Sequence, residues 1–104
     1  MPSYAWSGRL VPGREDDYKR RHDEIWPEMV ALLKEAGFIR YAIFRDGSTL
    51  FACFECDDPL AAARHMAASE VRARWSAHMA GIMEQTIDPQ TRFPRLLELQ
   101  WELT

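Results

Sequence analysis

The stretch FIRYAIFRDGSTLFACFEC, residues 38 to 56, decides the fold of this 104-residue chain. Its halves, 38–45 and 49–56, are rich in the β-branched and aromatic residues that favour strands. Between them stand Asp46, Gly47 and Ser48, which are typical of a tight turn. The stretch therefore predicts a β-hairpin.

The first strand of this hairpin is apolar on both faces. Simple alternation places its side chains on opposite faces, with Phe38, Ala42 and Phe44 on one and Ile39, Tyr41 and Ile43 on the other. An antiparallel sheet with one face in water alternates more cleanly than this. We expect the second face to meet the sheet of an identical chain or a small ligand in a shallow barrel, and a twofold dimer is the simplest closure.

The sequence before the hairpin predicts a strand and then a helix. Residues 3–10 alternate with a period of two, whereas residues 14–36 space their apolar side chains as a helix does. Gly37 follows where a helix often ends. Pro27 lies inside this region, so we expect a kink or a second helix that starts there, with Trp26 held away from helical angles.

The sequence after the hairpin predicts a second helical region, a loop and a strand. Residues 57–83 are helical in pattern, with Asp57 or Asp58 as a cap and Ser69 as the cap of a second segment. Residues 87–94 are expected to form a loop. Residues 95–103 alternate leucine and tryptophan with polar residues, and this pattern predicts a closing strand.

The predicted order is therefore strand, helix, strand, strand, helix, strand. This order is that of the α+β, ferredoxin-like βαββαβ fold, a four-stranded antiparallel sheet with its helices on one face. With a twofold partner, such a sheet would close into a dimeric α/β barrel. A chain of 104 residues suits one domain, which we expect to span residues 1–104.

Composition excludes several classes of function. The chain is 47% hydrophobic and 28% charged, with a net charge of only −3, so neither nucleic acid nor a membrane surface is an expected partner. No apolar run reaches the length of a membrane span and the N-terminus does not resemble a signal peptide, so we expect a cytoplasmic protein. Cys53 and Cys56 fall on opposite faces of a strand, which predicts two buried thiols rather than a redox or metal pair.

A row of ring side chains is the candidate for chemistry. Tyr18, His22 and Trp26 are spaced four apart, so a helix would align them. The imidazole of His22 can give or take a proton near neutral pH, although a histidine on a charged helix is often only solvated. No metal-ligand spacing, phosphate-binding loop or nucleophile elbow is present. The residues therefore leave proton transfer or plain binding, with no cofactor and no metal.

The chain also resembles a known family. The blocks YKRRHDEIWPEM, RYAIF, LFACFE and ARWSAHM occur in the order that the L-rhamnose mutarotase family has them. The family signature Tyr-x-x-x-His-x-x-x-Trp-Pro-Glu falls on Tyr18, His22, Trp26, Pro27 and Glu28. The resemblance implies a dimeric ferredoxin-like fold and an aldose 1-epimerase that acts on L-rhamnose.

The resemblance also implies roles for particular residues. His22 would be the proton donor, and Tyr18 and Tyr41 would bind the sugar. The family has two adjacent tryptophans that touch the substrate, and their positions here hold Trp75 and Ser76. Because Ser76 departs from the pattern, another 6-deoxy sugar such as L-fucose stays open as the substrate. A cofactor-free monooxygenase or a ligand-binding module on the same barrel is the alternative from another class.

Overall fold

The predicted hairpin forms as β2 (Ile39–Asp46) and β3 (Thr49–Glu55). The structure is a computed structural model that describes residues 2–104, so Met1, where the expected domain begins, lies outside the described residues. Gly47 makes the turn with a φ of 60°, a left-handed angle that glycine adopts without steric cost. The prediction of a hairpin is confirmed.

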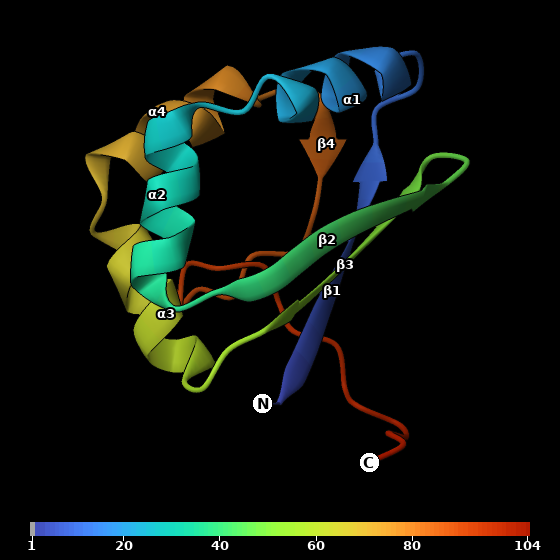
Figure 1. Ribbon diagram of the computed structural model, residues 1–104. Helices are drawn as coiled ribbons and strands as arrows, with labels where there is room; N and C mark the ends of the chain where they lie inside the picture. The colour runs from blue at the N-terminus through green and yellow to red at the C-terminus, as the bar shows by residue number, and fades with distance from the viewer. Residues whose placement is uncertain (1) are drawn as a thin grey trace.

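The sheet has four strands in the order β2-β3-β1-β4. β1 (Ser3–Leu10) pairs antiparallel with β3 along its length, from Ser3 opposite Glu55 to Arg9 opposite Thr49. The short β4 (Met83–Glu84) pairs antiparallel with the end of β1. Figure 1 shows the helices gathered on one side of this sheet. The arrangement is the predicted ferredoxin-like α+β fold.

Pro27 divides the first helical region into two helices, α1 (Glu15–Asp23) and α2 (Pro27–Ala36). Trp26 has φ −65° and ψ 137°, the extended angles that a following proline imposes, and Pro27 occupies the first turn of α2. Gly37 ends α2 with a φ of 102°. The break expected at Trp26 is confirmed, and α1 and α2 can point in different directions because of it.

The second helical region also divides, into α3 (Pro59–Ala67) and α4 (Glu70–His78). The carboxylate of Asp58 accepts a hydrogen bond from the Ala61 N–H at 3.1 Å, and the Ser69 hydroxyl accepts one from the Arg72 N–H at 3.3 Å. These are the predicted caps. The helix does not reach residue 83 as predicted, because Gly81 turns the chain at a φ of 80° and Met83 enters β4. No helix within residues 2–104 is long and apolar enough to cross a membrane.

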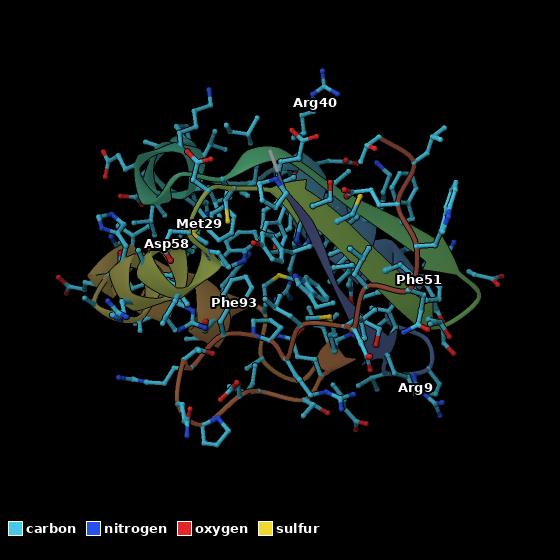
Figure 2. The ribbon with its side chains drawn as sticks, turned by 90° about the horizontal axis from the view of Figure 1, so that it is seen from below. Arg9, Met29, Arg40, Phe51, Asp58 and Phe93 are labelled. Atoms are coloured by element: carbon cyan, nitrogen blue, oxygen red, sulfur yellow. The ribbon has the colours of Figure 1, made fainter. Side chains whose placement is uncertain are left out.

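A β-bulge in β2 changes which side chains point to which face of the sheet, so they do not follow the simple alternation predicted above. The pairing of β2 with β3 is irregular between Ile39 and Ala42, and Arg40 there has a φ of 54°. The bulge shifts the alternation by one residue, so Phe38 packs in the core beside Tyr41 rather than on the face of Phe44. Figure 2 shows Arg40 projecting outward while Met29 and Phe93 point into the interior.

The prediction of a closing strand at residues 95–103 is wrong. The fourth strand is Met83–Glu84, and residues 95–104 belong to no strand. One backbone bond, from the Leu97 N–H to the Ala5 carbonyl at 2.8 Å, ties this segment to β1. Leu96 is half-buried against the core, whereas the later apolar side chains are exposed, with Trp101 at 76%. The alternation predicted an apolar face that packs against other residues, but within residues 2–104 nothing covers the exposed side chains from Leu97 onward.

The prediction of two buried thiols is half right. Both cysteines are free, and Cys56 is buried whereas Cys53 is exposed. Side chains of β3 alternate strictly between core and surface, and Cys53 falls on the surface side with Phe51. Figure 2 shows Phe51 on the sheet, away from the helices. The outer face of the sheet therefore carries exposed apolar side chains, with Phe51 on β3 and Phe44 on β2.

Candidate active site

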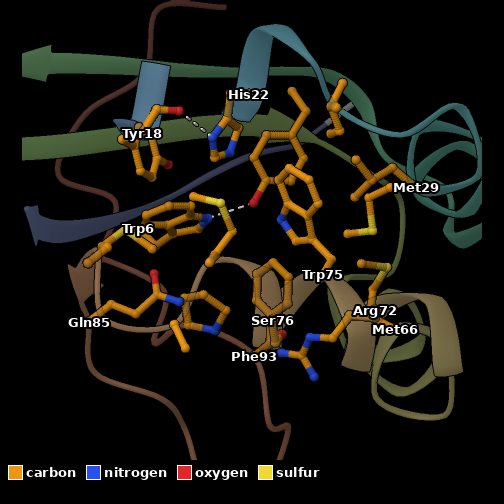
Figure 3. A pocket seen from close by; sticks show the side chains of 17 residues that line it. Trp6, Tyr18, His22, Met29, Met66, Arg72, Trp75, Ser76, Gln85 and Phe93 are labelled. Atoms are coloured by element: carbon orange, nitrogen blue, oxygen red, sulfur yellow. Dashed lines mark hydrogen bonds between the residues drawn. The ribbon is translucent and has the colours of Figure 1, made fainter. Parts of the chain in front are cut away.

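A cavity of about 350 Å³ lies between the sheet and the helices. That volume falls within the range of small-molecule sites. Apolar side chains from the sheet and the helices line it. The five residues that the sequence assigned to catalysis or sugar binding also line it: His22, Tyr18, Tyr41, Trp75 and Ser76. Figure 3 shows this cavity from close by. The fold thus brings α1, β2 and α4 together around one space.

His22 lies in the last turn of α1, half-buried at the wall of the cavity. Its ring stacks on that of Tyr18, with centroids 4.3 Å apart, and meets the Trp75 ring edge-on at 5.5 Å. Its Nδ1 is 3.2 Å from the carbonyl oxygen of Tyr18. Because a carbonyl can only accept, Nδ1 carries the hydrogen, and Nε2 is the nitrogen left to exchange a proton.

Burial sets the protonation state of His22. Burial lowers the pKa of the imidazole below its usual value, and the bond to the Tyr18 carbonyl and the charge of Asp23 oppose this only in part. The imidazole is therefore neutral at pH 7, with a lone pair on Nε2. A neutral imidazole in this state can accept a proton and then return it.

The phenols of Tyr18 and Tyr41 lie beside His22. Burial, and then the nearby Tyr41, raise the pKa of Tyr18. Burial raises the pKa of Tyr41 to about 12, although the hydrogen bond from Trp6 acts in the opposite direction. Trp6 Nε1 donates to the Tyr41 hydroxyl at 2.7 Å, so the hydrogen of that hydroxyl is free to point at a ligand. Both phenols are neutral hydrogen-bonding groups at pH 7.

Aromatic contacts hold Trp75 in place on α4. The ring of Trp26 meets it edge-on, with centroids 5.2 Å apart. Trp26 itself does not line the cavity, so the expected row of three rings divides into Tyr18 and His22 at the cavity and Trp26 behind it.

Two arginine contacts connect α4 to the other helices. Arg74 on α4 contacts α2 through a 3.4 Å hydrogen bond to Glu28. Arg21 also donates to the His78 carbonyl, which joins the ends of α1 and α4.

The loop at residues 87–94 closes another side of the cavity. Phe93 and Pro94 line the cavity, and the guanidinium of Arg72 donates to the Arg92 carbonyl at 2.7 Å. The loop is also closed internally, because the Asp88 N–H donates to the Phe93 carbonyl at 2.9 Å. Ser76, one turn after Arg72 on α4, is exposed at the edge of the same space.

Sequence reasoning missed three polar or aromatic groups at this cavity: Trp6, Arg72 and Gln85. The alternation of residues 3–10 predicted only that Trp6 lies on the apolar face of a strand, and nothing in the sequence predicted its hydrogen bond to Tyr41. Arg72 carried a weak signal, since it precedes Ser76 by one helical turn. Gln85 lies just after β4, in a region that the sequence assigned to no element.

Within residues 2–104, no group of three or more histidine, cysteine, aspartate or glutamate side chains is placed to hold a metal ion. The chemistry that the cavity offers comes from one imidazole, two phenols and the hydrogen-bonding groups around them. This set can hold hydroxyl groups and move a proton between them.

The family model for L-rhamnose mutarotase matches residues 3–102 of the chain. The L-rhamnose mutarotase of Brucella anthropi is 45% identical over 87 residues, which cover 82% of this chain and 81% of that protein. The L-rhamnose mutarotase of Agrobacterium fabrum is 43% identical over 91 residues, which cover 85% of this chain and 83% of that protein.

Solved structures give the same comparison in three dimensions. The crystal structure of an L-rhamnose mutarotase from Formosa agariphila matches with a TM-score of 0.78 and 32% identity, and covers 100% of both chains. Tetracenomycin F2 cyclase from Streptomyces glaucescens matches with a TM-score of 0.61 and 17% identity, over 100% of this chain and 98% of that one. The second likeness shows the fold alone.

Proposed function

Because the chain belongs to the L-rhamnose mutarotase family, we propose that it interconverts the α and β anomers of L-rhamnopyranose, with His22 as the proton-transfer group. Membership makes it an isomerase that acts on carbohydrates. One observation carries the assignment of His22. Its Nδ1 is held by the Tyr18 carbonyl, so Nε2 is the free nitrogen of a half-buried imidazole at a sugar-sized cavity.

The reaction needs only proton transfers. The anomeric hydroxyl loses its proton, the bond between C1 and the ring oxygen breaks, and the ring oxygen gains a proton. The aldehyde end then rotates about the bond between C1 and C2, and the reverse steps close the ring on the other face. No redox cofactor, metal or nucleophile takes part in this sequence, and one positioned acid–base group contributes about 100- to 10,000-fold.

The neutral state of His22 suits both transfers. Nε2 accepts the proton of the anomeric hydroxyl and delivers it to the ring oxygen, and both oxygens are bonded to the same carbon. The lowered pKa of His22 supports this role, because a permanently charged imidazolium could not start as the base. His22 is thus the proton donor to the ring oxygen, as the resemblance implies.

The phenols and the indole would hold the sugar around His22. Tyr18 and Tyr41 keep their hydrogens at pH 7 and can donate to sugar hydroxyls. Trp75 offers a flat apolar surface beside His22, which suits the methyl-bearing side of a 6-deoxy sugar. Ser76 adds a hydroxyl at the edge of the cavity and leaves room for a different substituent. L-Fucose is the second candidate substrate for that reason.

We also propose that the active form is a homodimer joined through the outer faces of two sheets. Phe44 on β2 is 63% exposed and stands opposite Phe51 on β3, which is 46% exposed. Such a patch on a sheet is a usual sign of a partner surface. The segment from residue 95 onward supports the same proposal, since Leu97, Leu99, Trp101 and Leu103 are exposed. Figure 1 shows this segment leading away from the helices to the C-terminal end.

The proposal treats residues 1–104 as one mutarotase-like domain, and the match of the family model to residues 3–102 supports it. A cytoplasmic location belongs to the proposal too. It is supported by the free and exposed thiol of Cys53, since exposed thiols persist in reducing compartments.

The test is the exchange of sugar anomers in the presence of the protein. Freshly dissolved L-rhamnose and L-fucose are followed by NMR exchange spectroscopy with wild-type protein and with His22→Gln. We expect faster exchange for L-rhamnose, and a loss of about 100-fold or more in His22→Gln. Undiminished exchange in this variant would remove His22 from the role, and no acceleration of either sugar would contradict the function.

A further inference from the structure

Polar groups gather on two walls of the cavity that face one another. Figure 3 shows Tyr18 and His22 along one wall and Gln85, Ser76 and Arg72 along the facing one. The surfaces between them are mostly apolar, from Trp6, Met79, Met83 and Phe93 among others. The second polar wall plays no part in the proton transfer described above.

Gln85 is the notable member of that second wall. Within residues 2–104, its Oε1 is the only buried side-chain nitrogen or oxygen atom without a hydrogen-bond partner. Buried polar atoms are nearly always paired, so an unpaired acceptor at a cavity wall indicates a ligand that completes the bond. The amide group also carries N–H hydrogens, so it can bond a hydroxyl group in either sense.

We infer that Gln85, with Ser76 on the same wall of the cavity, binds a hydroxyl group on the edge of the sugar ring opposite the anomeric carbon. This inference rests on the proposed function, because His22 fixes where the anomeric carbon lies. In a pyranose, C1 and the ring oxygen form one edge, and C3 and C4 form the opposite edge. With the first edge at His22, the hydroxyls on C3 and C4 point to the wall that holds Gln85.

Arg72 has a different task on this wall. Its guanidinium donates to the Arg92 carbonyl at 2.7 Å, so it holds the loop that carries Phe93 against the cavity. Arg72 is a positioning residue, and the hydroxyl is bound by neutral groups. Gln85 and Ser76 are neutral partners, which fit a neutral sugar.

This contact makes Gln85 a specificity-determining residue. L-Rhamnose and L-fucose have opposite configurations at C4, so their C4 hydroxyls leave the ring in different directions. One placed amide can meet only one of these directions well. A sugar that lacks the hydroxyl, or directs it elsewhere, leaves Oε1 of Gln85 buried and unpaired.

The test compares deoxy sugars on wild-type protein and on Gln85→Leu, which keeps the size of the side chain and removes its polar atoms. L-Rhamnose and its 3-deoxy and 4-deoxy analogues are assayed for kcat/KM by NMR exchange and for binding by tryptophan fluorescence. We expect the kcat/KM of wild type to be about 10- to 100-fold lower for one of the two analogues than for L-rhamnose. We expect Gln85→Leu to have a kcat/KM for L-rhamnose that is lower than that of wild type by a similar factor. Its kcat/KM values for L-rhamnose and for that analogue should be equal. Thr86→Val, an adjacent exposed position that does not line this cavity, is the matched control.

The wild-type arm does not depend on whether the leucine variant folds. If wild type accepts both deoxy analogues as well as L-rhamnose, the inference is wrong. The inference is also wrong if folded Gln85→Leu still prefers L-rhamnose over the deoxy analogue by the same factor as wild type does. If no sugar shows faster exchange, the proposed function fails while the binding measurement still decides the role of Gln85. If wild-type protein binds none of the sugars, both are wrong.

Discussion

The imidazole of His22 is stacked on the ring of Tyr18 at 4.3 Å and directs its Nδ1 to the carbonyl oxygen of the same residue, 3.2 Å away. Both contacts come from the spacing of four along α1, which puts the two side chains on one face. Tyr18 thus fixes the plane of the imidazole and the nitrogen that carries the hydrogen. The free Nε2 is left for the reaction.

The pH dependence of activity and of stability should both report the lowered pKa of His22. Because the neutral imidazole starts the reaction, kcat/KM should be at its full value at pH 7 and should decrease only below pH 6.5 as His22 is protonated.

The stability should depend on pH for the same reason. The unfolded chain binds a proton at His22 near pH 6.5 and the folded chain only at lower pH. The free energy of unfolding should therefore decrease as the pH falls from about 6.5 through the folded pKa.

Urea unfolding of wild type and His22→Gln across this range measures the second effect. The difference between the two proteins should change in the window just below pH 6.5 and be constant above it. A difference that is the same at every pH would contradict the assignment of a lowered pKa.

Tyr41→Phe should reduce stability as well as activity. The variant removes the acceptor of the Trp6 Nε1–H, and Trp6 is only 4% exposed, so a buried donor is left unpaired. We expect a loss of about 1–3 kcal/mol in the free energy of unfolding, measured in urea. Tyr4→Phe is the matched control, since Tyr4 does not line the cavity and should change stability by less than about 0.5 kcal/mol. Equal stability of Tyr41→Phe and wild type would argue that the Trp6 bond is not formed in solution.

Arg72→Met should loosen the loop at residues 87–94. The guanidinium bond to the Arg92 carbonyl is lost, so the amides of Asp88 and Phe93 should exchange hydrogen faster by mass spectrometry. KM should rise more than kcat falls, because Phe93 lines the cavity on the wall that faces His22. Arg64→Met, at an exposed position of α3, should leave both measurements unchanged. Unaltered loop exchange in Arg72→Met would mean that other contacts hold the loop.

A charge on the outer face of the sheet should prevent the proposed dimer. Phe44→Lys with Phe51→Lys places two positive charges at directly paired positions of β2 and β3. We expect a dimer for wild type and a monomer for this double variant by sedimentation velocity, because burying both charges in an apolar interface is costly. Leu60→Lys, at an exposed leucine on the helical side, should remain dimeric. A monomeric wild type would contradict the proposal directly.

The element order could be predicted because the signals are local. The turn at Gly47, the break at Trp26 and the caps at Asp58 and Ser69 each depend on a few neighbouring residues. The failures concern pairing across the chain. The bulge at Arg40 puts Phe38 on the opposite face from the predicted one. The alternation of residues 95–103 did not reveal that no strand in the described part of the chain forms a ladder with them.

The sequence by itself determined the order of the elements, the family and the identity of His22, Tyr18, Tyr41, Trp75 and Ser76 as one candidate set. Only the tertiary structure decided that these residues surround a single cavity, that Trp26 stands behind it, and that Gln85 faces His22 across it. The physical reason is distance along the chain. Local backbone preferences act over a few residues, whereas the cavity is built from side chains on α1, β2, α4 and the segment after β4, which meet only when the sheet and helices pack.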